Sequence, residues 1–531
     1  MNFKGLLKVN GKYIVDENNN NYILRGLGIG GWLVKEGYML KTKAPSPSTI
    51  DEAIIDLLGR KNGEIFLNKY IDNWFNELDI KAIKEFGFNS IRIPFHYKNI
   101  SRKYKQLNDD AFILLDKTIA LCKKYDLYVI LDMHCAPGSQ NGQNISDDLT
   151  NDAKLYSQNK KYQPGLNFIW KEIAKHYVNE DYIAGYDVIN EPVLNKENTM
   201  DELKKSYISL TKAIREVDNR HIIFIEGNKY ATQFEGLEPP FDDNMVYSFH
   251  KYWNECSKDA IRKYLDLRDK YNVPLWMSEI GENSNEWYYQ NIKMYEEDNI
   301  GWNWWTVKKL NNNNSIYSIK LPKNYDKLQN YWFNKGPKPT KKEAKIILDE
   351  LLENMKFENL IFQKGVLYSI IDHKKYKDKK AYKDFIIPTT INASHYDYGG
   401  PNTSYYKSNY MRDEFHKYGY NSQNIFRNDG VDILTINNEY EVLLSEINQY
   451  IDYTFININE NTYSIYLETN GRGNLSFYLN EELIISKSFN SNQYINTKLF
   501  EINLKEKNYT LRIKVNKPCL TIKNITIKKV I

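Results

Sequence analysis

Two glutamates follow buried, strand-like runs and could act together on one bond. Glu191 ends the run IAGYDVINE (183–191), and Glu279 lies near the end of VPLWMSEIG (273–281). Cleavage of a glycosidic bond requires a pair of carboxyl groups, one that donates a proton and one that attacks or stabilises the sugar carbon. A single glutamate at a strand end is more often a solvated loop residue, so this hypothesis depends on the surrounding side chains.

Other polar and aromatic side chains occupy the remaining apolar runs. Asp132 and His134 lie on one face of their run because side chains alternate along a strand, and His250 and Tyr252 are in register in the same way. Each could instead have a structural role. For example, a histidine in a protein core often has its hydrogen bonds satisfied there and takes no part in chemistry. A polar residue inside a run and three aromatic residues in the last run complete the set: Arg92, Trp302, Trp304 and Trp305.

The runs that carry these residues alternate with amphipathic segments up to about residue 310. Near-continuous hydrophobic strands between helices indicate parallel strands covered by helices, and eight repeats favour a closed (β/α)8 TIM barrel. Segments such as Asp79–Phe86, Asp110–Tyr125 and Lys341–Met355 have the helical spacing. In such a barrel, reactive groups gather at the carboxyl ends of the strands. The predicted strands are 22–29, 88–95, 127–134, 183–191, 221–227, 245–252, 273–281 and 301–307.

The remainder of the chain has a different character. The lysine-rich run HKKYKDKKAYKD (373–384) has no core pattern and is predicted to be a linker after a catalytic barrel domain of residues 1–372. Alternating strands separated by Asn, Gly and Lys-Asn turns then follow, which is typical of an all-β sandwich, here jelly-roll-like, over residues 385–531. All ten tryptophans lie at or before Trp332, which also marks this change.

Composition excludes several classes of protein. The 531 residues contain 72 Lys and Arg against 68 Asp and Glu, so the net charge of +4 gives no strong attraction to nucleic acid or anionic membranes. Four scattered cysteines do not suit a disulfide scaffold or zinc module. The sequence shows no transmembrane run and no signal peptide. We therefore expect a cytoplasmic protein as the chain is written, or a secreted one if a leader is missing.

Together these motifs resemble glycoside hydrolase family 5, the retaining glycosidases. The resemblance covers roughly residues 20–355 and implies a retaining glycoside hydrolase with a covalent glycosyl-enzyme intermediate and a carboxyl separation of about 5–5.5 Å. The motifs that carry it, in the family's order, are LRGLGIGGWL, FNSIRIPFHY, VILDMHCAPGSQNG, YDVINEPV, FIEGN, YSFHKY, WMSEIGE and GWNWWTVKK.

The resemblance implies a role for each matched residue. Glu191 would be the acid/base and Glu279 the nucleophile, with Glu282 as a rival nucleophile three residues later. Arg92 and Tyr252 would keep Glu279 ionised and aimed. The remaining residues would bind the sugar: Asn190 at its 2-hydroxyl, His134 and His250 along the subsite, and Trp305 beneath the ring.

The motifs RGLGIGGWL and HCAPGSQNG are most similar to the exo-β-1,3-glucanase branch, so β-1,3-glucan is the favoured substrate. Two cleft segments depart from that branch, GYMLKTKAPSPS and GENSNEWYYQN. Three alternatives therefore stay open. They are an endo-acting hydrolase on mannan, xylan or cellulose, a transglycosylase, and a non-catalytic glycan-binding protein.

The second region resembles a family 6 carbohydrate-binding module through INASHYDYGG, FRNDGVDI and IDYTFIN. The resemblance implies a sugar sandwiched between the rings of Phe426 and Tyr494. Where that family places acidic ligands of a structural calcium, this chain has Asn392 and Ser394, which argues against calcium. A packing domain without a ligand is the alternative.

A dinucleotide site is the remaining alternative, because Gly26, Gly28 and Gly31 follow a strand and Asp51 lies about twenty residues later. The motif requires a helix at the third glycine, and Gly37 with two prolines interrupts the segment that follows. The sequence contains no His-x-x-x-His or Cys-x-x-Cys spacing. We therefore expect no catalytic metal and no cofactor, and a monomer that binds oligo- or polysaccharide but no nucleic acid or membrane.

Overall fold

The computed structural model describes residues 3–408 and 425–530. The chain divides into two compact units, which are described separately. The first comprises Met1–Glu282 with Ile292–Phe362, and the second comprises Asn283–Asn291 with Gln363–Ile531. The short segment 283–291 follows a barrel strand in sequence but belongs with the second unit.

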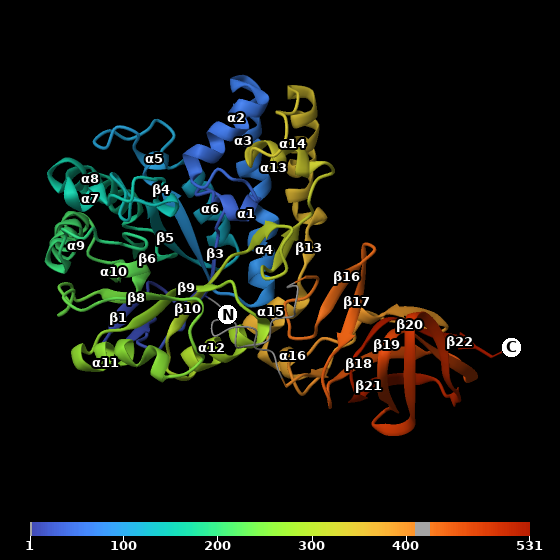
Figure 1. Ribbon diagram of the computed structural model, residues 1–531. Coiled ribbons are helices and arrows are strands. Elements are labelled where there is room, and N and C mark those ends of the chain that lie inside the picture. Colours follow the sequence, from blue (N-terminus) through green and yellow to red (C-terminus); the bar gives the residue numbers. More distant parts are fainter. Residues whose placement is uncertain (1–2, 409–424, 531) are drawn as a thin grey trace. The chain divides into compact units, whose positions relative to one another are not determined.

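Eight parallel strands close into a barrel in the first unit, which confirms the predicted TIM barrel (Figure 1). Around the barrel the strands follow their order in the sequence, and the last strand pairs with the first. The strands are buried on both faces, since side chains fill the interior and helices cover the exterior. They are β3 (Arg25–Gly28), β4 (Ser90–His96), β5 (Tyr128–Cys135), β6 (Ile183–Asp187), β7 (Ile222–Glu226), β8 (Met245–Lys251), β9 (Leu275–Gly281) and β10 (Gly301–Trp305).

The predicted helices are present around these strands. The helix at Lys341–Met355 has the predicted bounds, and its Thr340 forms a capping box with Glu343. The helices that cover or connect the strands are α2 (Pro47–Leu58), α3 (Arg60–Trp74), α4 (Glu77–Phe86), α6 (Ile113–Lys124), α8 (Asn159–Tyr177), α9 (Met200–Arg215), α11 (Arg262–Tyr271), α12 (Asn285–Glu297), α13 (Tyr325–Trp332) and α14 (Lys341–Met355). Short helical turns are α1 (Gly37–Leu40), α5 (Tyr97–Ile100), α7 (Lys154–Ser157) and α10 (Asn228–Ala231).

A hairpin that the sequence did not reveal packs at the amino end of the barrel. Strands β1 (Lys8–Asn10) and β2 (Tyr13–Val15) are antiparallel. Leu7 and Ile14 from this hairpin region join a buried cluster with Tyr128, Phe224 and Trp276. The amino end is therefore sealed by apolar side chains, and the carboxyl ends of the strands remain for chemistry.

A small sheet follows the last barrel strand. It contains β11 (Lys308–Leu310), β12 (Tyr317–Ile319) and β13 (Ile361–Phe362). The asparagine run at 311–314 lies between β11 and β12, as a loop of the barrel unit. Lys308 and Asp79 form a fully buried ion pair of 2.6 Å that joins β11 to α4.

The second unit is antiparallel and all-β after two short helices, as predicted. Within the lysine-rich run, residues His373–Lys377 form α16, and α15 (Lys364–Ile370) precedes it. Two strands are very long and bend at bulges, which lets the sheet curve around one apolar core. The strands are β14 (Thr389–Asn392), β15 (Tyr405–Tyr406), β16 (Ile433–Ile436), β17 (Glu439–Leu444), β18 (Tyr450–Asn457), β19 (Asn461–Leu479), β20 (Glu482–Leu504), β21 (Lys507–Lys517) and β22 (Leu520–Lys529).

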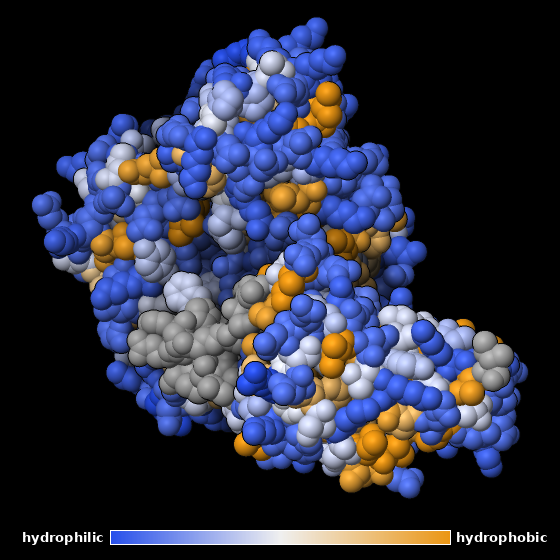
Figure 2. All heavy atoms as spheres, turned by 45° about the vertical axis from the view of Figure 1, so that its right-hand side comes forward, coloured by the Kyte–Doolittle hydropathy of each residue, from blue (hydrophilic) through white to orange (hydrophobic). Residues whose placement is uncertain are grey.

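The displayed surface is mainly polar (Figure 2), as expected for a chain in which 26% of the residues are charged. Figure 2 shows that hydrophilic residues cover most of the displayed face, with hydrophobic residues in small separate groups. Among the described residues, no helix is both long and apolar enough to span a membrane.

Candidate active site

The carboxyl ends of the barrel strands bring the predicted site residues together. Arg92 lies on β4, His134 on β5, His250 on β8 and Glu279 on β9, while Trp305 ends β10. Asn190 and Glu191 follow β6, and Tyr252 follows β8. Adjacent parallel strands end at the same rim, so residues far apart in sequence share one site.

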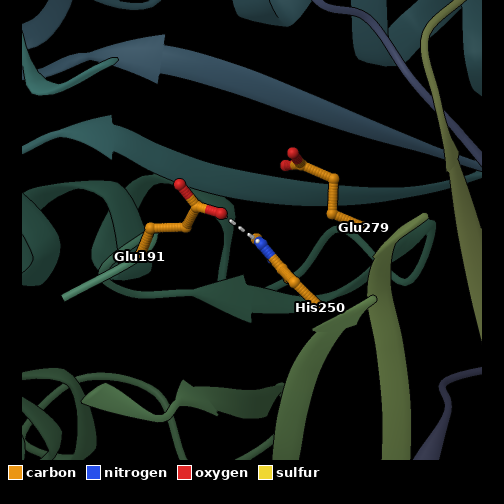
Figure 3. Close-up of side chains that lie close together, drawn as sticks. All are labelled: Glu191, His250 and Glu279. Carbon is orange, nitrogen blue, oxygen red and sulfur yellow. Dashed lines mark hydrogen bonds and ion pairs between the residues drawn. The ribbon is translucent and has the colours of Figure 1, made fainter. Parts of the chain in front are cut away.

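The two glutamates form a close pair. One carboxylate oxygen of Glu191, one of Glu279 and a ring nitrogen of His250 all lie within 4.8 Å of one another (Figure 3). Glu279 is 5% exposed, whereas Glu191 is less deeply buried and has a positive φ of 46°. A separation this short leaves no room for a water molecule between the carboxyl groups and a sugar, as an inverting mechanism would need.

Arg92 lies at the centre of a buried network of charged side chains. Its guanidinium is fully buried and contacts four carboxylates on four strands: Asp132 at 3.1 Å, Asp187 at 2.8 Å, Glu226 at 3.0 Å and Glu279 at 2.9 Å. It also donates to the Asn190 side-chain oxygen at 2.9 Å. The planar fork of arginine suits several fixed acceptors at once. Arg92 thus fixes the orientation of both Glu279 and Asn190.

Glu279 is held by two donors but is not strongly acidic. The Tyr252 hydroxyl donates to its Oε1, and Arg92 Nη1 donates to its Oε2. Burial raises the pKa of Glu279 above its ordinary value, and the positive charges of His250 and Arg92 oppose this shift without cancelling it. The expectation that Arg92 and Tyr252 favour the ionised form agrees with these contacts, but desolvation outweighs them.

His250 bridges two carboxylates with its two ring nitrogens. Nδ1 lies 2.8 Å from Glu191 Oε1 (Figure 3). Nε2 lies 3.2 Å from Glu226 Oε1. Burial opposes the charged ring, but the neighbouring carboxylates of Glu226 and Glu279 raise the pKa of His250 well above its ordinary value. A charged His250 donates from both nitrogens and aims the Glu191 carboxylate. With both nitrogens protonated, it offers no lone pair to a metal.

His134 and Trp305 are buried and stack on one another in the site. Their rings are parallel, 5° apart in plane, with centroids 5.5 Å apart. Asp132 accepts from His134 Nδ1 at 2.8 Å, which fixes the ring. Trp302 and Trp304 are fully buried, and Trp302 donates to Glu296, so the barrel wall holds these two tryptophans.

Two carboxylates near the pair escaped the sequence analysis. Glu226 ends β7, accepts from the Glu191 backbone N–H at 2.6 Å and contacts both Arg92 and His250. Glu36 is buried within electrostatic reach of Glu191, Glu279 and His134, and desolvation raises its pKa to about 8. The strand-end rule applied to HIIFIEG would have found Glu226. Glu36 lies in a loop, where the sequence carries no such signal.

Glu282 has a different environment from Glu279. Its Oε1 lies 2.6 Å from Lys309 Nζ in an ion pair with a buried lysine. Lys309 also donates to Asn314. Glu282 therefore pairs with a lysine on β11, whereas Glu279 pairs with Arg92.

The glycines of the dinucleotide-like motif serve packing. A Cβ on Gly28 would lie 2.7 Å from the Trp305 ring, and one on Gly31 would lie 2.3 Å from the Trp74 ring. Gly31 has a φ of +80°, and the helix that a phosphate site requires does not begin there. Asp51 instead pairs with Lys35 at 2.9 Å.

In the second unit, Phe426 and Tyr494 have separate partners. Phe426 packs with Tyr440 and His395, with ring centroids 4.7 and 5.6 Å apart. The Tyr494 hydroxyl donates to Glu441. No ring contact joins Phe426 to Tyr494 in the described part of the chain. The Asn392 side-chain oxygen accepts from the backbone and hydroxyl of Ser394 at 3.0 and 2.7 Å, so it caps a local turn.

Comparisons with known proteins agree with this geometry. Residues 60–311 match the family described as cellulase (glycosyl hydrolase family 5). A beta-xylosidase of Phanerodontia chrysosporium is 30% identical over 343 residues, which is 57% of this chain and 71% of the relative. An endoglucanase C of Acetivibrio thermocellus is 27% identical over 311 residues, which is 46% of this chain and 88% of the relative.

A glucan 1,3-beta-glucosidase 2 of Candida albicans is 32% identical over 234 residues, covering 38% of this chain and 46% of that protein. The names of these relatives denote glycosidases that act on different glycans. The barrel, the close carboxylate pair at its rim and these similarities lead to one conclusion: the chain belongs to glycosyl hydrolase family 5 and is a retaining glycoside hydrolase.

Proposed function

We propose that the chain hydrolyses a β-linked glucan by double displacement, with Glu279 as the nucleophile and Glu191 as the acid/base. The observation that carries this proposal is the separation of at most 4.8 Å between an oxygen of each carboxylate. Retaining glycosidases place their carboxyl groups about 5–5.5 Å apart, because one must reach the anomeric carbon while the other reaches the leaving oxygen.

In the first step, Glu279 attacks the anomeric carbon as the bond from that carbon to the leaving oxygen breaks. Glu191 gives its proton to the leaving oxygen, so the departing sugar leaves as an alcohol. Arg92 and Tyr252 aim the attacking carboxylate, and Asn190 is placed by Arg92 to meet the sugar 2-hydroxyl. Trp305 and the parallel ring of His134 provide a wall for the sugar.

In the second step, water replaces the enzyme at the anomeric carbon. The ester on Glu279 carries no negative charge, so Glu191 no longer faces an anionic neighbour. Glu191, aimed by His250, takes a proton from water as the water oxygen bonds to the anomeric carbon and Glu279 departs as a carboxylate. Two inversions give net retention.

The favoured backbone is β-1,3-glucan, and the relatives' names support β-glucan or xylan as the substrate class. Trp253 beside Tyr252 is 58% exposed and offers a second aromatic surface at the rim. Such a surface suits the leaving sugar of a longer chain. Product analysis on β-1,3-glucan, β-1,4-glucan, mannan and xylan tests the assignment. Release of monosaccharide from β-1,3-glucan alone supports the exo-glucanase, and mixed oligomers favour an endo-acting enzyme.

Azide tests the two roles separately. With Glu279→Ala, azide should restore cleavage of an activated aryl β-glycoside and give an α-glycosyl azide, because azide replaces the nucleophile. With Glu191→Ala, azide should intercept the covalent intermediate and give a β-glycosyl azide. Loss of activity should reach at least about 10²–10⁴-fold in each variant. The reverse assignment of the two azide products would contradict the proposed roles, and equal inactivity of Glu279→Ala and the parent would favour a non-catalytic glycan-binding protein.

For the second unit, we propose sugar binding of the family 6 type through Phe426. The half-buried Phe426 ring and the 38% exposed Tyr440 ring support this proposal. Binding of β-glucan to the full chain carrying Glu279→Gln should weaken when Phe426→Ala is added. Unchanged binding would favour a packing domain.

A further inference from the structure

A groove in the barrel unit is built from the segment after β3 and the segment around α13. It has a volume of about 550 Å³, within the range of small-molecule sites. The Tyr38 and Phe333 rings line it and are 47% and 43% exposed, so their faces are available for stacking. The side chains that define this groove are Tyr38, Lys41, Lys43, Asn144, Gln329 and Phe333.

Two hydrogen bonds link the lining of the groove and its neighbouring loop to residues of the candidate active site. The Tyr38 hydroxyl accepts from Trp305 Nε1 at 3.1 Å, so its ring is exposed in the groove while its hydroxyl lies at the wall of the active site. Asn144 donates to the Pro45 carbonyl, and the same loop contains Asn141, which donates to the Glu191 carbonyl at 3.1 Å. These contacts place the groove next to the wall of the candidate active site.

The lining of the groove carries positive charge. Its lining contains two lysines and no acid. Lys43 is exposed and Lys41 is half-buried. Burial lowers the pKa of Lys41, and no carboxylate in the described part of the chain raises it. An ammonium group that is partly desolvated and lacks an anionic neighbour favours an anionic ligand.

From the stacking surfaces, the amides and the two lysines, we propose that the groove binds a sugar bearing a carboxylate, adjacent to the sugar whose bond is cleaved. Aromatic rings and amides suit the sugar face and its hydroxyls, and Lys41 and Lys43 suit the carboxylate. This inference rests on the proposed function and narrows its substrate to an acidic or partly acidic β-glycan.

The test compares neutral substrates with carboxylated ones. The probes are β-1,3- and β-1,4-linked gluco-oligosaccharides, each in neutral form and after partial oxidation of C6 to carboxylate. We expect kcat/KM to be higher for the oxidised form of the cleaved backbone. Lys41→Gln combined with Lys43→Gln should reduce the ratio of oxidised to neutral kcat/KM about tenfold, the effect of one charge-assisted bond. Mass spectrometry of the products should place the carboxylated residue beside the newly formed end.

The matched control is Lys175→Gln with Lys212→Gln, which removes the same charge from exposed lysines in the last turns of α8 and α9. The control should leave the ratio unchanged, whereas added salt should lower the ratio in the parent. Calorimetric binding of the oxidised oligomers to Glu279→Gln gives a readout without turnover.

An unchanged ratio of oxidised to neutral kcat/KM in the groove variant would overturn the groove proposal, and so would equal binding of neutral and oxidised oligomers. Cleavage of the neutral oligomers would still support the proposed function in either case. Failure of the parent to cleave either neutral backbone would instead count against the proposed function. The binding measurement would then decide the groove proposal by itself.

Discussion

Arg92 pairs with carboxylates from four barrel strands, and these contacts explain how a buried site can hold so many acidic side chains. Burial and the neighbouring Glu226 raise the pKa of Asp187 well above its ordinary value, which favours its protonated form. Arg92 and His250 have the opposite effect on Glu226 and keep it ionised despite burial. The net charge of the cluster is thereby limited, and Glu279 remains available for ionisation.

Tyr252→Phe tests how Glu279 is kept reactive. The hydroxyl donates to Glu279 and favours its ionised form, so loss of the hydroxyl should raise the pKa of Glu279 further. Since the nucleophile must be ionised, the acid limb of the kcat/KM profile should move to higher pH, by about one unit. The profile on an aryl β-glycoside measures this shift.

Tyr331→Phe is the matched control, because its hydroxyl donates to Asp56 on the surface at 2.8 Å. That variant should keep the parental profile. An acid limb that stays in place in Tyr252→Phe would show that Tyr252 does not set the ionisation of Glu279.

Candidate site residues could be predicted from the sequence because strand alternation and strand ends identify inward-facing groups. Glu279 and His250 were found in this way, and the structure places them together. Glu226 has the same signal and was overlooked beside Glu191. The groove lysines could not be found, because their position depends on how a loop after β3 meets α13, and no periodic pattern encodes that contact.

At the scale of elements, a buried ion pair fastens the small sheet to the barrel. The side chains of Lys308 and Asp79 are fully buried. Asp79 also accepts a hydrogen bond from the backbone N–H of Asn76 at the start of α4. Lys308→Met would leave a buried carboxylate without its cation, which costs about 3–5 kcal/mol. The melting temperature of the barrel unit should fall at pH 7.

The defect of Lys308→Met should shrink as the pH falls. Burial already raises the pKa of Asp79, and loss of Lys308 removes an opposing influence, so Asp79 takes up a proton more readily in the variant. Lys320→Met, at an exposed position, should have no comparable effect. Equal melting temperatures for the parent and Lys308→Met at pH 7 would disprove this role of the pair.

The barrel strands could be predicted to within a few residues because each is buried on both faces and stands out as an apolar run. The β1–β2 hairpin and the sheet of β11, β12 and β13 could not, because their strands have only two or three residues. Such short segments are stabilised by distant contacts, such as that between Ile14 and the barrel end, and carry no periodicity of their own.

At the scale of the whole molecule, the segment 283–291 follows the strand that carries Glu279 and belongs to the second unit. Asn428 donates to the Asn283 carbonyl at 2.7 Å, and the Asn285 backbone donates to the Asn428 carbonyl at 2.9 Å. Removal of residues 363–531 would leave this segment, which begins four residues after Glu279, without these partners. We expect the shortened chain to lose at least about tenfold in kcat although every candidate catalytic residue is retained.

In the full chain, Asn428→Ala should cause a smaller loss of the same kind, since it removes the side-chain bond to Asn283. Asn496→Ala, at an exposed position on β20, serves as the control. Both effects are measured on an aryl β-glycoside together with the melting temperature. Parental kcat in the shortened chain would show that the second unit does not support the loop after β9.

The central claim is that Glu279 forms the covalent bond to the sugar. An activated 2-deoxy-2-fluoro-β-glucoside slows the second displacement, so the intermediate accumulates and peptide mass spectrometry can locate the label. We expect one fluoroglucosyl group on Glu279 in the parent and no label in Glu279→Gln. A label on Glu282, Glu191 or Glu226 in the parent would contradict the central claim.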